Sequence, residues 1–150
     1  MGFYKMSKNK LEILSLSFTN YTKSGIINSM KVSCEKQVVW IGSSRKDIKE
    51  FPEDIRDDFG VSLFHAQLGG QHPDAKPLHG LGSGILELVA NDRSGTYRAV
   101  YTIALGEFVY VLHCFQKKSK TGIKTSQRDI ELIKSRLKDA KQDYQRRCLK

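Results

Sequence analysis

The residues best suited to chemistry in this chain lie within positions 86–118, where three β-rich runs follow one another. Arg98 is embedded in the middle run, and two lysines, Lys117 and Lys118, stand at the end of the last run. A guanidinium inside a strand is costly unless it is paired or used. Cations held on a rigid sheet can bind a phosphodiester and stabilise the charge that develops as it is cleaved. The pattern therefore indicates RNA phosphodiester chemistry.

The charge distribution is consistent with a nucleic-acid partner. The chain has a net charge of +9, and residues 117–150 hold twelve basic and four acidic side chains. Residues 44–74 hold four basic and seven acidic ones. A basic pole of this kind is typical of proteins that bind nucleic acid or an acidic partner. A solvated helix face accounts for the same charges, and charge alone does not separate the two interpretations.

Cysteine, histidine and hydropathy patterns exclude several other classes. Cys34, Cys114 and Cys148 show no short spacing, so neither a disulfide framework nor a zinc motif is indicated, and a cytoplasmic location is expected. The four histidines lack a metal-binding spacing, and we expect no metal or other cofactor. No apolar run is long enough to cross a membrane, and Glu12 interrupts the short apolar stretch near the start, which argues against a signal peptide.

The first 35 residues differ from the rest of the chain. They show weak periodicity and are rich in Ser, Asn, Thr and Lys. We expect residues 1–35 to be an extension that is disordered or lies upstream of a translation start at Met30. Residues 36–150 are expected to form one domain.

The element pattern predicts a small α+β domain with the order β-α-α-β-β-β-α. A β-run at residues 37–41 precedes two helices, one beginning at Ser44 with Asp47 as its capping partner and one beginning near Pro52. Three further β-runs are joined by short polar linkers, so we expect them to pair as antiparallel neighbours in one sheet. These runs span residues 85–90, 96–105 and 108–115.

The last predicted helix begins near Ser126, and Asp129 is placed to complete its capping box. Its apolar positions are alternately four and three residues apart, which gives one apolar stripe and leaves the other faces basic. The stripe consists of Ile130, Ile133, Leu137, Ala140 and Tyr144, and the basic residues are Lys134, Arg136, Lys138, Lys141, Arg146 and Arg147.

Four motifs occur in order between residues 36 and 143: Lys76-Pro-Leu-His-Gly-Leu-Gly, Leu86-Glu-Leu, Tyr97-Arg-Ala-Val-Tyr101 and Leu112-His-Cys-Phe-Gln-Lys-Lys118. Together they resemble the RelE/ParE toxin superfamily, in particular its phage-derived, HigB-like branch. The resemblance implies a RelE-like fold. It also implies the toxin of a type II toxin–antitoxin system, a metal-independent mRNA endoribonuclease that depends on the ribosome and inhibits translation. The partners implied are mRNA on the ribosome and a small antitoxin with a helix-turn-helix.

The resemblance also implies roles for individual residues. In that superfamily the arginine of the YR motif contacts the scissile phosphate, and basic residues after the last strand bind or protonate around it. By position these are Arg98, Lys117 and Lys118; we assign Lys117 to catalysis, because residues 117 and 118 point to opposite faces of a continuing strand. The resemblance does not identify a general base in this chain; from its position in the Gly-rich loop, His79 is either the general base or a surface residue of the loop. The expected RNA contacts are Lys118, Lys120, Lys124 and Lys76, together with the C-terminal basic helix.

Two departures from the family pattern leave alternatives open. Many members have an arginine where this chain has Val89, and RelE has lysines along the strand on which this chain has Glu87. Glu87 also offers Arg98 a purely structural ion pair. His113 is either an acid or base, or a core histidine with satisfied hydrogen bonds. Tyr97 and Tyr101 are either base-stacking residues or part of the core.

Two other functions are therefore compatible with the sequence. One is a ParE-like toxin that inhibits gyrase by binding it, and the other is a non-catalytic relic that binds RNA or antitoxin. The cleavage hypothesis requires the guanidinium of Arg98 to open toward solvent beside the lysine end of the last strand. An Arg98 sealed inside and neutralised by a carboxylate would remove the predicted cleavage site.

Overall fold

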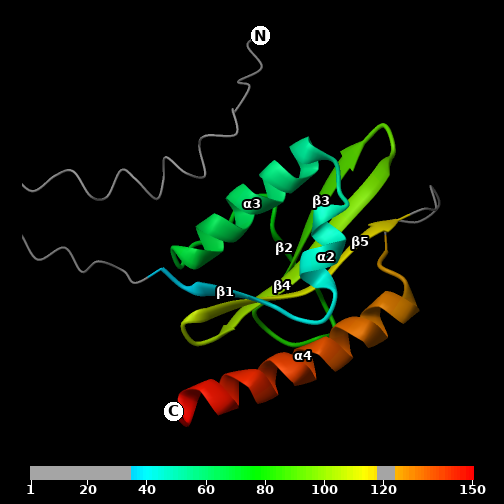
Figure 1. Cartoon of the computed structure of the whole chain (residues 1–150). Coiled ribbons are helices and arrows are strands. Elements are labelled where there is room, and N and C mark those ends of the chain that lie inside the picture. Colours follow the sequence, from blue (N-terminus) through cyan, green and yellow to red (C-terminus); the bar gives the residue numbers. More distant parts are fainter. Residues whose placement is uncertain (1–34, 118–123) are drawn as a thin grey trace, which may run out of the picture. The chain divides into compact units, whose positions relative to one another are not determined.

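A five-stranded sheet with the strand order β1-β5-β4-β3-β2 lies at the centre of the fold (Figure 1). The computed structural model describes residues 35–117 and 124–150. Strands β3, β4 and β5 form an antiparallel meander, and β1 adds to β5 in parallel. The strands are β1 (Gln37–Trp40), β2 (Lys76–Pro77), β3 (Ile85–Asp92), β4 (Gly95–Leu105) and β5 (Phe108–Lys117).

The predicted α+β class and element order are confirmed, with one addition. Strand β2 forms within a stretch that the sequence indicated only as turn-rich, and it pairs with β3 through Lys76 and Pro77. A proline is tolerated there because β2 is an edge strand, where a missing N–H interrupts no inner ladder. The described residues form the helices α2 (Ser44–Lys49), α3 (Glu53–Gln67) and α4 (Gln127–Cys148).

The two long helices pack on opposite faces of the sheet. Helix α3 buries Ile55, Phe59 and Leu63 in one apolar cluster, and α4 buries Ile133 and Leu137 in another. The sheet serves both clusters because alternate residues of a strand point to opposite faces. Strand β4 therefore divides its side chains, with Tyr97, Ala99 and Tyr101 on the α3 face and Val100 on the α4 face.

The start of α4 follows the predicted capping box. The Ser126 side chain accepts a hydrogen bond from the Asp129 backbone N–H at 3.2 Å, and its hydroxyl donates to the Asp129 carboxylate at 2.5 Å. This fixes where the helix begins, since an N-cap satisfies a backbone donor that has no partner within the helix.

The capping box predicted at Ser44 is wrong. Ser44 is the first helical residue of α2, and its buried hydroxyl donates to the Val111 carbonyl at 3.1 Å instead. Ser43 occupies the N-cap position, and its hydroxyl donates to Asp47 at 2.7 Å. Ser44 thus ties α2 to strand β5 rather than capping its own helix.

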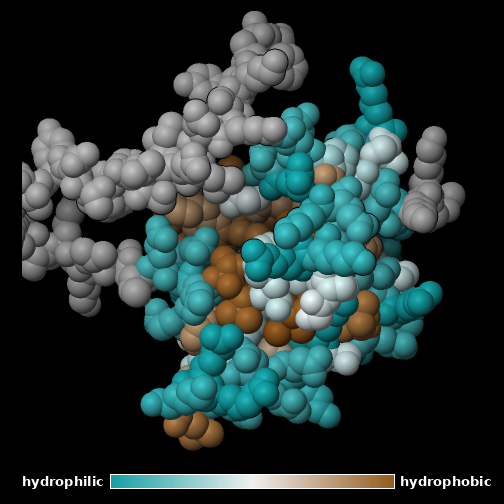
Figure 2. Space-filling model, in the orientation of Figure 1, coloured by the Kyte–Doolittle hydropathy of each residue, from teal (hydrophilic) through white to brown (hydrophobic). Residues whose placement is uncertain are grey.

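Several predictions fall outside the described residues. The extension at residues 1–35, except Glu35, and the start at Met30 lie there, as do Lys118 and Lys120. Among the residues that the structure does describe, no helix has both the length and the apolar character needed to span a bilayer. The surface over α4 is largely hydrophilic, and apolar side chains gather where β1 passes between α3 and α4 (Figure 2).

Candidate functional site

Strand pairing gathers most of the described candidate residues on the α4 face of the sheet. Arg98 lies two residues from Val100 on β4 and therefore shares its face. Arg98 is paired across the ladder with Phe115, and Lys117 follows two residues later on that side of β5. Lys76 is paired with Glu87, so both side chains share one face of the β2–β3 ladder. Four adjacent strands thus contribute ionisable groups to one area.

Arg98 does not open toward solvent, so the condition that the sequence set for a cleavage site is not met in this arrangement. The residue is only 4% exposed, and its Nη1 lies 2.8 Å from Glu87 Oε1. The pair forms because Glu87 lies opposite Val100, one diagonal step from Arg98 on the same face. Glu87 is itself largely covered, with 13% of its side chain exposed. The structural ion pair raised as an alternative is therefore present.

Thr125 joins this pair to the beginning of α4. Its hydroxyl donates to Glu87 Oε1 at 2.8 Å, and Arg98 Nη1 donates to the same hydroxyl at 3.5 Å. Thr125 directly precedes the N-cap Ser126, so the capping box that starts α4 also positions Thr125 over the sheet. We call Glu87, Arg98 and Thr125 the Arg98 cluster. No sequence signal indicated Thr125.

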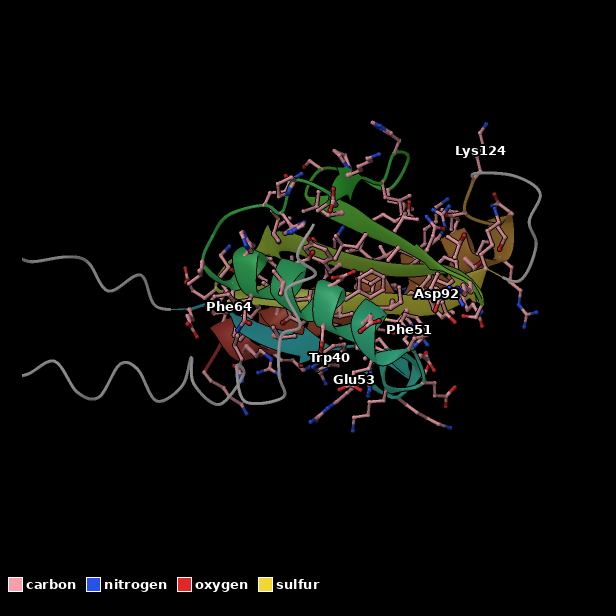
Figure 3. The ribbon with its side chains drawn as sticks, turned by 90° about the horizontal axis from the view of Figure 1, so that it is seen from above. Trp40, Phe51, Glu53, Phe64, Asp92 and Lys124 are labelled. Atoms are coloured by element: carbon pink, nitrogen blue, oxygen red, sulfur yellow. The ribbon has the colours of Figure 1, made fainter. Side chains whose placement is uncertain are left out.

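The other predicted site residues differ in their placement. Lys117 donates from Nζ to the Lys124 carbonyl at 2.9 Å, which ties the end of β5 to the segment before α4. Lys124 is exposed, and Figure 3 shows it on the same side of the view as Asp92 at the end of β3. Lys76 is exposed beside Glu87.

His79 is not brought to this area. Leu78 donates its backbone N–H to Ile85, so the chain after β2 runs along β3 away from the Val89–Arg98 pair. His79 follows Leu78 and is exposed in the loop beyond. A general base must be within hydrogen-bond reach of the proton it removes, directly or through one water. His79 does not meet that condition for a phosphate bound at Arg98.

His113 belongs to a second group on the same face, the His113 cluster of His113, Asp129 and Arg136. Its Nε2 lies 3.1 Å from Asp129 Oδ1, and its Nδ1 lies 3.1 Å from Arg136 Nη1. Because a guanidinium can only donate, Nδ1 accepts and the ring proton resides on Nε2. Burial and the Arg136 charge lower the pKa of His113, while Asp129 acts in the opposite direction. His113 is thus a satisfied core histidine rather than a free acid or base.

Arg136 is the residue that the sequence placed wrongly. The helical pattern assigned it to the exposed basic faces, yet it turns inward and donates to His113 Nδ1, to the Leu112 carbonyl and to the Ser43 hydroxyl. Gly42, with φ of 57°, makes this possible, because a Cβ there would lie 2.9 Å from Arg136 Nε. Arg136 therefore ties α4 to β5 and to the start of α2.

The tyrosines of β4 and the possible metal ligands remain to be placed in the structure. Tyr97 and Tyr101 are 5% and 0% exposed in the α3-face core, so core packing rather than base stacking describes them. Within residues 35–117 and 124–150, no group of three His, Cys, Asp or Glu side chains is arranged to hold a metal ion.

The fold and the site define an α+β domain in which a buried arginine–carboxylate pair is hydrogen-bonded to the residue before the N-cap of a basic helix. Residues 46–138, more than half of the chain, match the family described as Phage derived protein Gp49-like (DUF891), and the chain belongs to that family. The expectation of a phage-derived protein family is thereby confirmed.

Curated protein sequences and solved structures provide two further comparisons. No curated protein sequence matches this chain. The crystal structure of the toxin–antitoxin complex RelBE2 from Mycobacterium tuberculosis contains a chain with 22% sequence identity to this one and a TM-score of 0.34. The match covers 57% of this chain and 94% of that one.

Proposed function

We propose that this protein is the toxin of a type II toxin–antitoxin pair and that it inhibits translation as a metal-independent endoribonuclease acting on ribosome-bound mRNA in the cytoplasm. Membership of the phage-derived family over residues 46–138 is the observation that carries the proposal. The matched segment includes both members of the Glu87–Arg98 pair. A small antitoxin with a helix-turn-helix is the proposed partner that holds the toxin inactive.

The charge of the α4 face supports an RNA substrate. Lys76, Lys124 and Arg128 are exposed around the Arg98 cluster, and the outer surface of α4 adds further cations. Single-stranded RNA carries one negative charge per phosphate, so such a surface attracts it and retains it in a salt-dependent manner. The ribosome would supply the orientation of the mRNA that a small basic domain lacks.

The proposed reaction is a transfer within the RNA backbone. The 2′-oxygen loses its proton and attacks the adjacent phosphorus, the bond from phosphorus to the 5′-oxygen breaks, and that leaving oxygen takes up a proton. The products are a 2′,3′-cyclic phosphate and a free 5′-hydroxyl. Three groups are needed: a base, a cation for the phosphorane charge and an acid.

The Arg98 cluster supplies two of these groups side by side. The Arg98 guanidinium can bracket two phosphate oxygens, and the Glu87 carboxylate 2.8 Å away is close enough to take the proton from a 2′-hydroxyl beside the same phosphate. We therefore assign the general base to Glu87 in place of His79. Lys117, two residues from the cross-strand partner of Arg98, is the proposed acid.

Access to this pair requires Thr125 to move. The pair is covered in this structure, and Thr125 is hydrogen-bonded to both members. Its interactions are a hydrogen bond of 2.8 Å to the Glu87 carboxylate and one of 3.5 Å from the Arg98 guanidinium, and a hydrogen bond to a charged group contributes about 1.5–3 kcal/mol net. The charge-assisted hydrogen bonds between a phosphate and Arg98 would have to offset the loss of these two bonds.

Burial of the pair also favours a second candidate function. The Arg98 guanidinium is 4% exposed and is already paired with the Glu87 carboxylate, which is typical of a structural ion pair. In that case the protein binds RNA or antitoxin without cleaving RNA. Substitution of Glu87 separates the two candidates, because only the enzyme needs an ionised carboxylate for turnover.

The decisive experiment maps RNA 5′ ends after induction of the full chain in bacteria. Glu87→Gln preserves the side-chain shape and removes the base, so we expect cleavage to fall at least about a hundredfold. Glu131→Gln, on the exposed surface of α4, is the matched control and should cleave like the unsubstituted chain. Circular dichroism verifies that both variants fold.

Each outcome assigns one of the functions. New 5′ ends within codons that disappear in Glu87→Gln support the enzyme. Growth arrest without new RNA ends, and equal in both variants, assigns the non-catalytic binder. DNA breaks without new RNA ends assign the ParE-like inhibitor of gyrase. Either of the last two results overturns the proposed endoribonuclease.

A further inference from the structure

A shallow cavity of about 660 Å³ lies where the end of β5 meets the first turns of α4, and neither the proposed base nor the proposed acid lines it. Its lining combines aromatic, aliphatic, acidic and basic side chains. They are His113, Phe115, Ser126, Arg128, Asp129 and Leu132.

One part of the cavity wall is suited to a flat ring. Phe115 stacks on His113 with ring centroids 4.6 Å apart and planes only 18° from parallel. Phe115 is half-buried, and Leu132, on α4, keeps 38% of its surface exposed. An aromatic and an aliphatic side chain at the edge of one cavity form the kind of surface on which an unstacked base is bound in single-stranded RNA.

The polar lining is held in place before any ligand binds. The two oxygens of Asp129 interact with His113 at 3.1 Å and with the Ser126 hydroxyl at 2.5 Å, so the carboxylate has little freedom to turn. A carboxylate oxygen can accept more than one hydrogen bond, and base amino and imino groups are donors. Arg128 is exposed at the same cavity and can meet a phosphate.

The cavity is also next to the proposed cleavage site. Phe115 is the cross-strand partner of Arg98, and directly opposed side chains in an antiparallel ladder have Cβ atoms about 5 Å apart. Thr125 of the Arg98 cluster immediately precedes Ser126 of the cavity. A nucleotide in the cavity would therefore adjoin the phosphate at Arg98.

We propose that this cavity binds one unstacked base of single-stranded RNA, with the base against Phe115 and Leu132 and its donor groups facing Asp129. The inference rests on the proposed function in that RNA is the ligand. It goes beyond that function by naming a base-binding site, which selects where along the strand cleavage occurs.

The test measures binding rather than cleavage. The full chain is titrated against fluorescein-labelled single-stranded oligonucleotides of eight residues, 2′-O-methylated throughout so that cleavage cannot occur. Leu132→Asn removes the apolar contact, and Val61→Asn on α3 is the matched control, because Val61 is also 38% exposed on a helix surface. We expect about tenfold weaker binding for Leu132→Asn, as stacking of one base is worth about that factor, and less than a twofold change for the control.

A second pair of variants and a change in the ligand separate a base site from plain charge attraction. Arg128→Gln on α4 and Arg56→Gln on α3 each remove one exposed arginine, and only the former should weaken binding about tenfold. Oligonucleotides with one abasic position, moved along the strand, should lose affinity at a single position. That loss should be absent in Leu132→Asn, because the same contact is already gone.

Equal effects of Leu132→Asn and Val61→Asn, or an affinity loss that is uniform along the abasic series, would overturn the base site and leave only backbone attraction. These results are independent of the proposed endoribonuclease. A chain that binds one base in the cavity but produces no new RNA ends would retain this inference and refute the cleavage. A chain that cleaves RNA without the expected binding pattern would do the reverse.

Discussion

The two faces of the sheet are built on different principles. The α3 face is packed with apolar and aromatic side chains, such as Phe51, Phe59 and Tyr97. The α4 face is apolar only along part of the helix, and near the beginning of α4 it holds Arg98 and His113 instead. The α3 face thus contributes mainly stability, whereas the α4 face combines a core with groups capable of chemistry.

Polar groups are also treated differently on the two faces. Within the described residues, the α4 face holds two pairs of ionisable side chains, with Glu87 bound to Arg98 and Asp129 bound to His113. On the α3 face the buried Tyr101 hydroxyl has no hydrogen-bond partner within the described part of the chain, and burial raises its pKa to about 12. One buried hydroxyl without a hydrogen bond lowers the stability of the fold only moderately, whereas a buried charge without a partner would lower it far more.

The largest expected effect lies on the α3 face. Phe59 is 1% exposed and packs edge-on against Phe51, so Phe59→Ala should lower the free energy of unfolding by about 4 kcal/mol through lost burial and a cavity. Val61→Ala, two residues along α3 but exposed, should change it by less than about 0.5 kcal/mol. Urea denaturation measures both. Similar losses for the two variants would show that α3 does not bury one defined face.

A smaller loss is expected from breaking the buried pair on the α4 face. Arg98→Ala leaves the Glu87 carboxylate covered and uncompensated, and should lower the free energy of unfolding by about 3 kcal/mol. The double variant Glu87→Leu with Arg98→Met removes both charges together and should recover most of this loss. Thermal unfolding of the two variants compares them. If the double variant is as unstable as the single one, the loss comes from packing rather than from an unpaired charge.

This prediction also affects how function is tested. Because Arg98→Ala disturbs the fold, loss of toxicity in that variant would not identify a catalytic role. Glu87→Gln keeps the shape of the side chain and its bond to Thr125, but it leaves the Arg98 charge uncompensated, so its free energy of unfolding has to be measured beside its activity.

Much of the fold could be predicted because it follows from local patterns. Three β-rich runs within residues 85–115 and the short polar linkers between them give the antiparallel meander, and the spacing of Ile133, Leu137 and Ala140 gives the buried stripe of α4. Ser126 and Asp129 mark where that helix begins. Strand β2 escaped prediction because its two residues are too few to show a period.

The arrangement of the site could be predicted only in part, because it depends on contacts between distant segments. Arg98 is recognisable as an unusual strand residue, and Glu87 is a neighbour once the strands are paired. Thr125 and Arg136 give no such signal, since their partners lie 38 and 93 positions away in Glu87 and Ser43. A basic residue on a helical wheel is normally assigned to solvent, and Arg136 departs from that rule through a side chain that turns inward.

His113, on the α4 face, should make the free energy of unfolding depend on pH. Its pKa in the folded protein lies below the usual value of 6.5, chiefly because of burial, so the unfolded chain binds the proton more readily. The contribution of His113 to stability is therefore fully present above about pH 6.5 and is lost as the pH falls through the lower folded pKa. One proton changes the free energy of unfolding by at most about 1.4 kcal/mol per pH unit.

The measurement is urea denaturation between pH 7 and pH 5. His113→Gln should show a flatter dependence than the unsubstituted chain, while His79→Gln, in the exposed loop, should leave the dependence unchanged. If both histidine variants follow the same curve as the unsubstituted chain, protonation of His113 is not linked to folding, and the lowered pKa is refuted.

The smallest change in stability is expected at Ser126, the N-cap of α4 on the α4 face. Ser126→Ala removes the acceptor for the Asp129 N–H and should lower the free energy of unfolding by about 1 kcal/mol. Ser135→Ala, within α4 and exposed, removes no cap and should be neutral or slightly stabilising. Because Ser126 also holds the Asp129 carboxylate, its loss should loosen the start of the helix, where Thr125 covers Arg98. Hydrogen exchange of amides 127–130 tests this directly. We expect faster exchange in Ser126→Ala but not in Ser135→Ala. Equal exchange in the two variants would show that the N-cap does not hold Thr125 over the Arg98 cluster.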